Sequence, residues 1–118
     1  MSQSILIPKS LKFASKIIKL QYYLSKTKKE SIISKQIIRS ATSIGANINE
    51  ANYGSSKSDF IAKMHIALKE CAETEYWIRL LEADYIENEL FNILITDCLD
   101  IKRMLIATLN TAKKNNIK

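Results

Sequence analysis

The clearest pattern of apolar positions lies between residues 60 and 85, where they recur at alternating steps of four and three. This spacing places one residue per helical turn on a single face and is typical of the heptad seam of a helical bundle. Two further segments, one before and one after it, repeat the pattern. The three seams consist of Phe60, Met64, Ala67, Cys71, Thr74, Ile78, Leu81 and Tyr85; of Ile37, Ala41, Ile44, Ile48 and Ala51; and of Leu94, Cys98, Ile101, Leu105, Thr108 and Ala112.

Start and stop signals divide the chain into four expected helices. A proline in a first turn, a glycine stop and the spacing of capping boxes supply most of the boundaries. These signals are Pro8, Thr27, Glu30, Gly54, Ser56 and Asp59, with Asp84 and Asn88 as alternative caps of the last helix. The helices should span about 9–26, 28–53, 57–84 and 87–113. Short connections between them predict one all-α domain over residues 1–118, an antiparallel up-down-up-down four-helix bundle.

Composition agrees with a helical fold. The 118 residues include only two Gly and one Pro, too few for the many tight turns of a sheet protein. No apolar run approaches the roughly 20 residues of a membrane span, and the start of the chain lacks the features of a signal peptide. We therefore expect a soluble cytoplasmic protein, in which Cys71 and Cys98 are buried thiols rather than a disulfide scaffold.

The charge of +6 is unevenly spread along the chain. Residues 1–29 carry seven Lys and no acid, whereas residues 59–100 carry ten acids and three bases. Residues 101–118 again carry five bases and no acid. If both ends of the chain meet in the fold, they form one basic surface that attracts phosphates.

A helical wheel concentrates the lysines of the first helix on one side, beside Tyr23. The last helix can lie next to the first in an antiparallel bundle and extend this ridge. We expect such a ridge to bind RNA or DNA through backbone phosphates, although an ordinary solvated lysine face explains the same pattern. The candidate residues are Lys9, Lys12, Lys16, Lys19, Lys26, Lys102, Arg103, Lys113 and Lys114.

Two helices are apolar over more of their surface than one bundle needs. The first places Phe13, Ile17, Leu20 and Leu24 on one face, and Leu11, Ile18 and Tyr22 about 150° away. The third carries a second apolar set away from its seam, namely Ile66, Tyr76, Trp77 and Leu80. We interpret these faces as contacts between subunits. Deep burial of the third helix within one monomer is the alternative.

A polar lane runs beside the seam of the second helix at spacings of three or four. Arg39 in this lane needs a carboxylate partner if it is partly buried, and Glu70 and Glu73 of the third helix can supply one. The lane offers no nucleophile beside a base, so a structural role is favoured. Its members are Gln36, Arg39, Ser43, Asn47 and Glu50.

The run RSATSIGANINE at residues 39–50, followed by SKSDF at 56–60 and IALKECAE at 66–73, resembles a known family. It is similar to the four-helix bundle proteins encoded in bacterial 23S rRNA intervening sequences, and the likeness covers nearly the whole chain. The segment TEYWIRLL at 74–81 resembles one branch of that family.

This resemblance implies a ring-like homopentamer. A similar branch serves as the accessory protein of diversity-generating retroelements, which binds nucleic acid and a reverse transcriptase, so both are possible partners. The residues that match the family motif are assigned to packing within or between subunits. They are Arg39, Ser43, Asn47, Glu50, Asp59 and Glu73, and Trp77 joins them from the related segment. The lysine ridge lies outside the motif.

Enzyme sites are not predicted. A di-iron bundle needs Glu-x-x-His pairs, but Ala62 lies three residues before His65, the only histidine. Zinc would require clustered ligands, and a phosphate-cradling loop would require more glycine. We therefore expect no catalytic residues, no metal and no cofactor. Two hypotheses stand: an oligomeric nucleic-acid-binding protein and a protein-binding scaffold without nucleic-acid contact.

Overall fold

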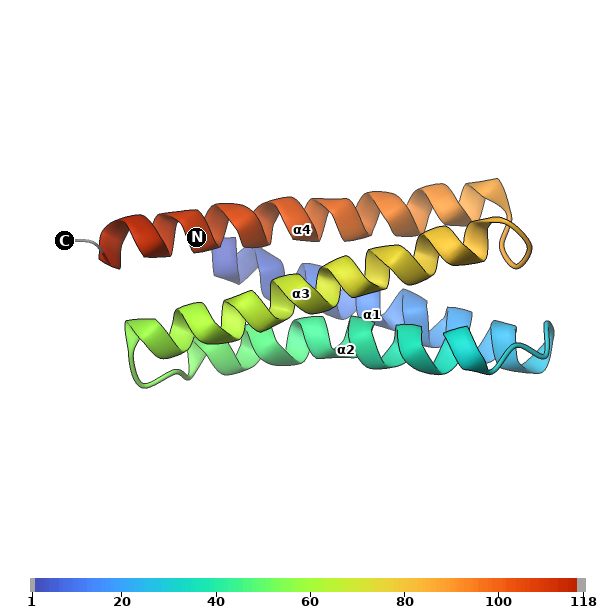
Figure 1. The fold of residues 1–118 in the computed structure, drawn as a ribbon, viewed down its shortest axis with the longest axis horizontal. Coiled ribbons are helices and arrows are strands. Elements are labelled where there is room, and N and C mark those ends of the chain that lie inside the picture. Colours follow the sequence, from blue (N-terminus) through green and yellow to red (C-terminus); the bar gives the residue numbers. More distant parts are fainter. Residues whose placement is uncertain (1, 117–118) are drawn as a thin grey trace.

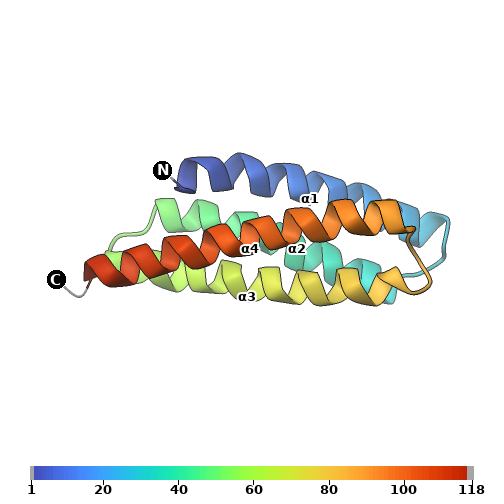
Figure 2. The ribbon, with the colours of Figure 1, turned by 90° about the horizontal axis from the view of Figure 1, so that it is seen from above.

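Consecutive helices run in opposite directions along the long axis of the molecule (Figure 1). The structure, a computed structural model, describes residues 2–116. These form an elongated all-α bundle that measures 52 × 22 × 20 Å. Its helices are α1 (Ser2–Lys26), α2 (Ile32–Asn52), α3 (Lys57–Glu82) and α4 (Asn88–Asn116). Helix α1 packs against α2 and α4, and α3 packs against the same two helices from the other side (Figures 1 and 2).

The predicted seams form the core. Every seam residue is buried except Phe60 and Tyr85, which lie half-buried at the ends of the α3 seam. Helix α1 adds Leu6, Phe13, Ile17, Leu20 and Leu24, all of them buried. The heptad spacing was therefore a correct guide to the packed faces, because residues that share a helix face meet the same neighbouring helices.

The second apolar faces lie on the outside of the bundle. On α1, Leu11 and Tyr22 are 66% and 64% exposed. On α3, Tyr76 is 59% exposed and Leu80 is 43% exposed. Trp77 of the same set is half-buried against the core. Deep burial of the third helix within the monomer was nevertheless a wrong alternative, since most of this second face stays exposed.

Helix α1 begins earlier than its proline suggested. The predicted start near residue 9 is wrong, because α1 begins at Ser2 and Pro8 lies exposed inside it. A proline at this position removes one backbone hydrogen bond. The side chain of Leu6, fully buried in the core, stabilises the turns before Pro8 and offsets that loss.

The turn between α1 and α2 is organised by Glu30. The N–H groups of Thr27 and Lys28 still bond to the carbonyl of Tyr23, and Lys29 adopts a positive φ of 56°. The buried Glu30 carboxylate then accepts hydrogen bonds from the N–H groups of Ile32, Ile33 and Ser34 at 2.8–3.0 Å. The predicted start near residue 28 with a Thr27 cap is therefore wrong, and Glu30 itself caps α2.

Loss of this cap should destabilise the bundle. Replacing Glu30 with Ala leaves three N–H groups without their acceptor and should lower the free energy of unfolding by about 1–2 kcal/mol. Urea unfolding followed by circular dichroism measures the change. Thr27→Ala is the matched control and should change stability by less than about 0.5 kcal/mol. Equal losses in the two variants would contradict the assignment of the cap to Glu30.

The other two turns lie where the sequence placed them. Ser56 Oγ accepts the N–H of Asp59 at 3.0 Å, as its capping-box spacing predicted. Helix α4 begins at Asn88, one residue from the expected start at about 87. Gly54 follows the end of α2 without a positive φ. Space explains the glycine, because a Cβ there would lie 2.9 Å from Asp59 Oδ2 and 3.2 Å from the carbonyl oxygen of Ala51.

The two cysteines face each other between α3 and α4. Both are fully buried free thiols, with their Sγ atoms 3.8 Å apart. Each Sγ also approaches the other residue's carbonyl oxygen, at 3.4 and 3.5 Å. Hydrogen bonding to Cys71, followed by burial, raises the pKa of Cys98 far above its usual range. Both thiols therefore act as small core residues.

Candidate nucleic-acid interface

Helix α1 presents three exposed lysines on its outward face, spaced seven residues apart. Lys12, Lys19 and Lys26, here called the basic stripe, lie outside the packed face that contains Phe13 and Leu20. Seven residues correspond to two helical turns, so their Cα atoms are about 10 Å apart along the helix. A row of ammonium groups at this spacing can contact several phosphates of one strand.

These lysines are not neutralised by the bundle. Across the part of the chain that the structure describes, no carboxylate forms an ion pair with any lysine of the basic stripe. Lys26 Nζ lies 5.9 Å from the centre of the Tyr22 ring, a cation–π distance. The three charges therefore remain available to an anionic partner.

The other two α1 lysines of the predicted ridge, Lys9 and Lys16, face α4. Lys16 Nζ lies 2.6 Å from Asp97 Oδ2, and Lys9 Nζ lies 3.8 Å from Asp100 Oδ2. Helix α4 thus brings carboxylates, rather than further cations, to its contact with α1. Lys9 and Lys16 are partly neutralised and hold the two helices together more than they extend the basic surface.

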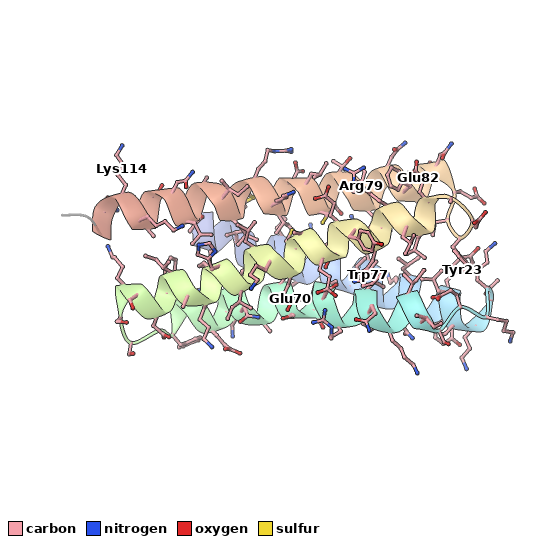
Figure 3. All side chains as sticks on the ribbon, viewed as in Figure 1. Tyr23, Glu70, Trp77, Arg79, Glu82 and Lys114 are labelled. Atoms are coloured by element: carbon pink, nitrogen blue, oxygen red, sulfur yellow. The ribbon has the colours of Figure 1, made fainter. Side chains whose placement is uncertain are left out.

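The α4 cations are divided among other neighbours. Lys102 Nζ bonds to Glu75 Oε1 of α3 at 2.9 Å, and Lys113 Nζ lies 3.0 Å from His65 Nε2 of the same helix. Arg103 pairs with Asp100 on its own helix. Lys114 points away from the bundle in the last turn of α4 (Figure 3). The structure therefore does not join these four residues to the basic stripe.

Two shallow hollows at one end of the bundle were missed by the sequence reading. Both border Tyr23 and the first turn of α4 and have volumes of about 230 and 260 Å³. Figure 3 shows Tyr23 near the end that holds the α1–α2 and α3–α4 turns. The adjacent pair Tyr22 and Tyr23 between lysines was the available signal, because aromatic side chains among cations are typical of single-strand binding surfaces.

The polar lane of α2 forms an ion-pair cluster with α3. Arg39 donates to Glu70 Oε1 at 3.2 Å and also pairs with Glu73, and Trp77 Nε1 donates to Glu73 Oε2 at 3.0 Å. The hydrogen bond from Arg39 is the main reason that the pKa of Glu73 is lowered, with a smaller contribution from Trp77. The same bond raises the pKa of Arg39. The cluster holds α2 against α3 at the surface.

This cluster should give the bundle a small pH dependence. A carboxylate whose folded pKa is lowered contributes stability above its unfolded pKa and loses it as the pH falls through the folded pKa. Glu73→Gln should therefore reduce the free energy of unfolding by about 1 kcal/mol or less at pH 7, since the pair is half exposed. The difference from the parent should shrink below about pH 4.3, the ordinary glutamate pKa. Urea unfolding at pH 7 and pH 3 tests this, and a difference that grows on acidification would contradict it.

The remaining motif residues make local contacts on α2 and α3. Asn47 Nδ2 donates to the Ser43 carbonyl at 2.8 Å and to Ser43 Oγ at 3.0 Å. Glu50 pairs with Lys63 of α3 at 3.1 Å. The backbone N–H of Asp59 donates the capping hydrogen bond to Ser56 Oγ. These contacts serve packing, and they leave no nucleophile beside a base.

Among residues 2–116, no three His, Cys, Asp or Glu side chains gather closely enough to hold a metal ion. No helix within that range has an apolar stretch that could span a membrane.

Comparison with known proteins identifies the family of this bundle. The model of the 23S rRNA-intervening sequence protein family matches residues 2–107. The chain belongs to this family. No curated protein matches the chain. Neither the family nor the structural neighbour described next indicates an enzyme class.

A solved structure supports the same assignment. A protein of unknown function from the S23 ribosomal protein family of Bacteroides thetaiotaomicron VPI-5482 superposes with a TM-score of 0.90. It is 45% identical to this chain, and the match covers 93% of this chain and 99% of that one. The family resemblance drawn from residues 39–81 is therefore confirmed, as is the all-α fold.

Proposed function

We propose that this intervening-sequence family protein is a non-enzymatic, cytoplasmic nucleic-acid-binding protein that contacts phosphates through α1. The observation that carries the proposal is the basic stripe of Lys12, Lys19 and Lys26, three exposed ammonium groups without an ion-pair partner in the described chain. By contrast, seven other cations of the described chain are held in ion pairs with carboxylates, namely Lys9, Lys16, Arg39, Lys63, Arg79, Lys102 and Arg103.

The chemistry of the stripe favours contact with the backbone over reading of sequence. Lysine presents a compact charge that binds phosphate oxygens without distinguishing bases. Affinity from such contacts falls steeply as salt rises, because binding releases the cations condensed on the nucleic acid.

Fluorescence anisotropy with labelled single-stranded and duplex RNA and DNA at low salt tests the proposal. Binding to at least one of the four probes is the expected result. If all four stay unbound by protein at micromolar concentration, the proposal fails.

We propose that the protein acts as a homo-oligomer, and the family resemblance suggests a homopentamer. Support comes from the exposed apolar side chains Leu11, Ile18 and Tyr22 of α1. Next to them, a groove of about 450 Å³ between α1 and α2 is lined by small residues that include Ala14 and Gly45. Native mass spectrometry should give a mass near five times the 13.5 kDa chain. Monomer alone at micromolar concentration would contradict the proposal.

The second candidate is a scaffold that binds a protein, such as a reverse transcriptase, without touching nucleic acid. It is favoured by the aromatic pair on α3, where the exposed Tyr76 ring packs edge-on against Trp77 with centroids 5.1 Å apart. Aromatic anchors dominate many protein interfaces. Partner binding that persists in high salt and is lost on Tyr76→Ala would favour this candidate.

A further inference from the structure

The two hollows beside Tyr23 adjoin each other. One is lined by Lys16, Lys19, Leu20, Tyr23 and Leu90, and the other by Tyr23, Ile86, Glu87, Glu89 and Leu90. Tyr23 and Leu90 border both, so the hollows form one shallow surface where the end of α1 meets the start of α4.

The shared part of this surface is apolar and carries an aromatic ring. Leu20 is buried beneath it, Leu90 and Ile86 are half-buried, and Tyr23 is 39% exposed. A flat ring can stack on an exposed tyrosine while covering aliphatic side chains, and this is how many proteins hold unpaired nucleobases.

The two rims carry opposite charges. Lys16 and Lys19 border one hollow, and of these Lys19 belongs to the unpaired basic stripe. Glu87 and Glu89, both exposed, border the other. A phosphate is attracted to the lysine rim and repelled by the glutamate rim, whereas a carboxylate can accept a hydrogen bond from the amino group of a base.

We propose that this surface binds one unpaired nucleotide of a single-stranded nucleic acid, an inference that rests on the proposed function. The base stacks on Tyr23, its phosphate lies at Lys19, and its amino edge faces Glu87 and Glu89. Bases in a duplex are already stacked and paired, so single strands bind more tightly than duplexes. Cytosine, which has an amino group at this edge, binds more tightly than uracil, which has a carbonyl oxygen there.

The test compares 12-nucleotide single strands with abasic strands that carry the same number of phosphates, using fluorescence anisotropy. The parent protein should bind the cytidine strand about tenfold more tightly than the abasic strand. Tyr23→Ala should remove that gain and leave abasic binding unchanged, and Tyr23→Phe should retain it. Tyr53→Ala, which alters an exposed tyrosine just after the end of α2, is the matched control and should behave like the parent.

The carboxylate rim has its own comparison. The parent should bind cytidine strands more tightly than uridine strands. The double variant Glu87→Gln, Glu89→Gln should reduce this preference. Equal binding of cytidine and uridine strands by the parent overturns this part of the inference.

The outcomes separate the inference from the function on which it rests. Equal affinity of the parent for base-containing and abasic strands overturns the nucleotide site and leaves phosphate binding intact. Equal weakening of both strands by Tyr23→Ala also overturns it. If the parent binds neither the base-containing strand nor the abasic strand, both the nucleotide site and the proposed nucleic-acid binding are overturned.

Discussion

Reversing the charge of the basic stripe is expected to abolish most nucleic-acid binding. The variant Lys12→Glu, Lys19→Glu, Lys26→Glu changes the net charge by six, from +6 to 0. Loss of three phosphate contacts should weaken binding to a single strand by about 100-fold at 0.1 M salt. Anisotropy titration of the parent and the variant with one labelled oligonucleotide measures the change.

A matched variant separates local contact from overall charge. Lys35→Glu, Lys57→Glu, Lys69→Glu makes the same change of net charge on α2 and α3, at three exposed lysines without an ion pair in the described chain. It should weaken binding by less than tenfold, since only long-range attraction is lost. Equal losses in both triple variants would show that net charge, rather than α1, governs binding.

Truncating the core anchor of α1 is expected to have the largest effect on stability. Phe13 is 1% exposed and lies on the face of α1 that packs into the bundle. Phe13→Ala removes a large buried ring and leaves a cavity, which should cost about 3–5 kcal/mol. That is a large share of the 5–15 kcal/mol that stabilises a typical domain. Urea unfolding followed by circular dichroism measures the loss.

Leu11→Ala on the same helix is the control for Phe13→Ala. Leu11 is 66% exposed, so its truncation should change the stability of the monomer by less than about 0.5 kcal/mol. If the α1 face lies between subunits, the same substitution should weaken assembly in native mass spectrometry. A loss of monomer stability as large as that of Phe13→Ala would contradict the packing described for α1.

The sequence predicted the helices and their packed faces well, because heptad spacing reports burial directly. Its errors lie at turns, where several local solutions compete. Thr27 and Glu30 have the spacing of a capping box, yet the N–H of Thr27 bonds back to the last turn of α1 and Glu30 caps the next helix alone. A proline such as Pro8 marks the start of a helix only when no residue before it is held in the core. Leu6 is buried in the core, so the helix extends beyond Pro8 toward the N-terminus.

The candidate site was harder to predict. A helical wheel shows on which side of its helix a residue lies, but it does not show which residues of other helices lie next to it. Lys16 and Lys19 are alike in sequence, but only Lys16 meets a carboxylate, Asp97 of α4. Lys102 likewise faces α3 and pairs with Glu75. Which lysines remain free depends on contacts between helices far apart in the chain, and these required the structure.

The salt dependence of binding by the parent protein tests the central claim most directly. Affinity for a labelled single strand is measured from 50 to 200 mM salt, and its logarithm is plotted against that of the salt concentration. Contact of three lysines with phosphates predicts a slope of about −2 or steeper. An affinity that does not change over this range, or no binding at 50 mM salt, would contradict the account.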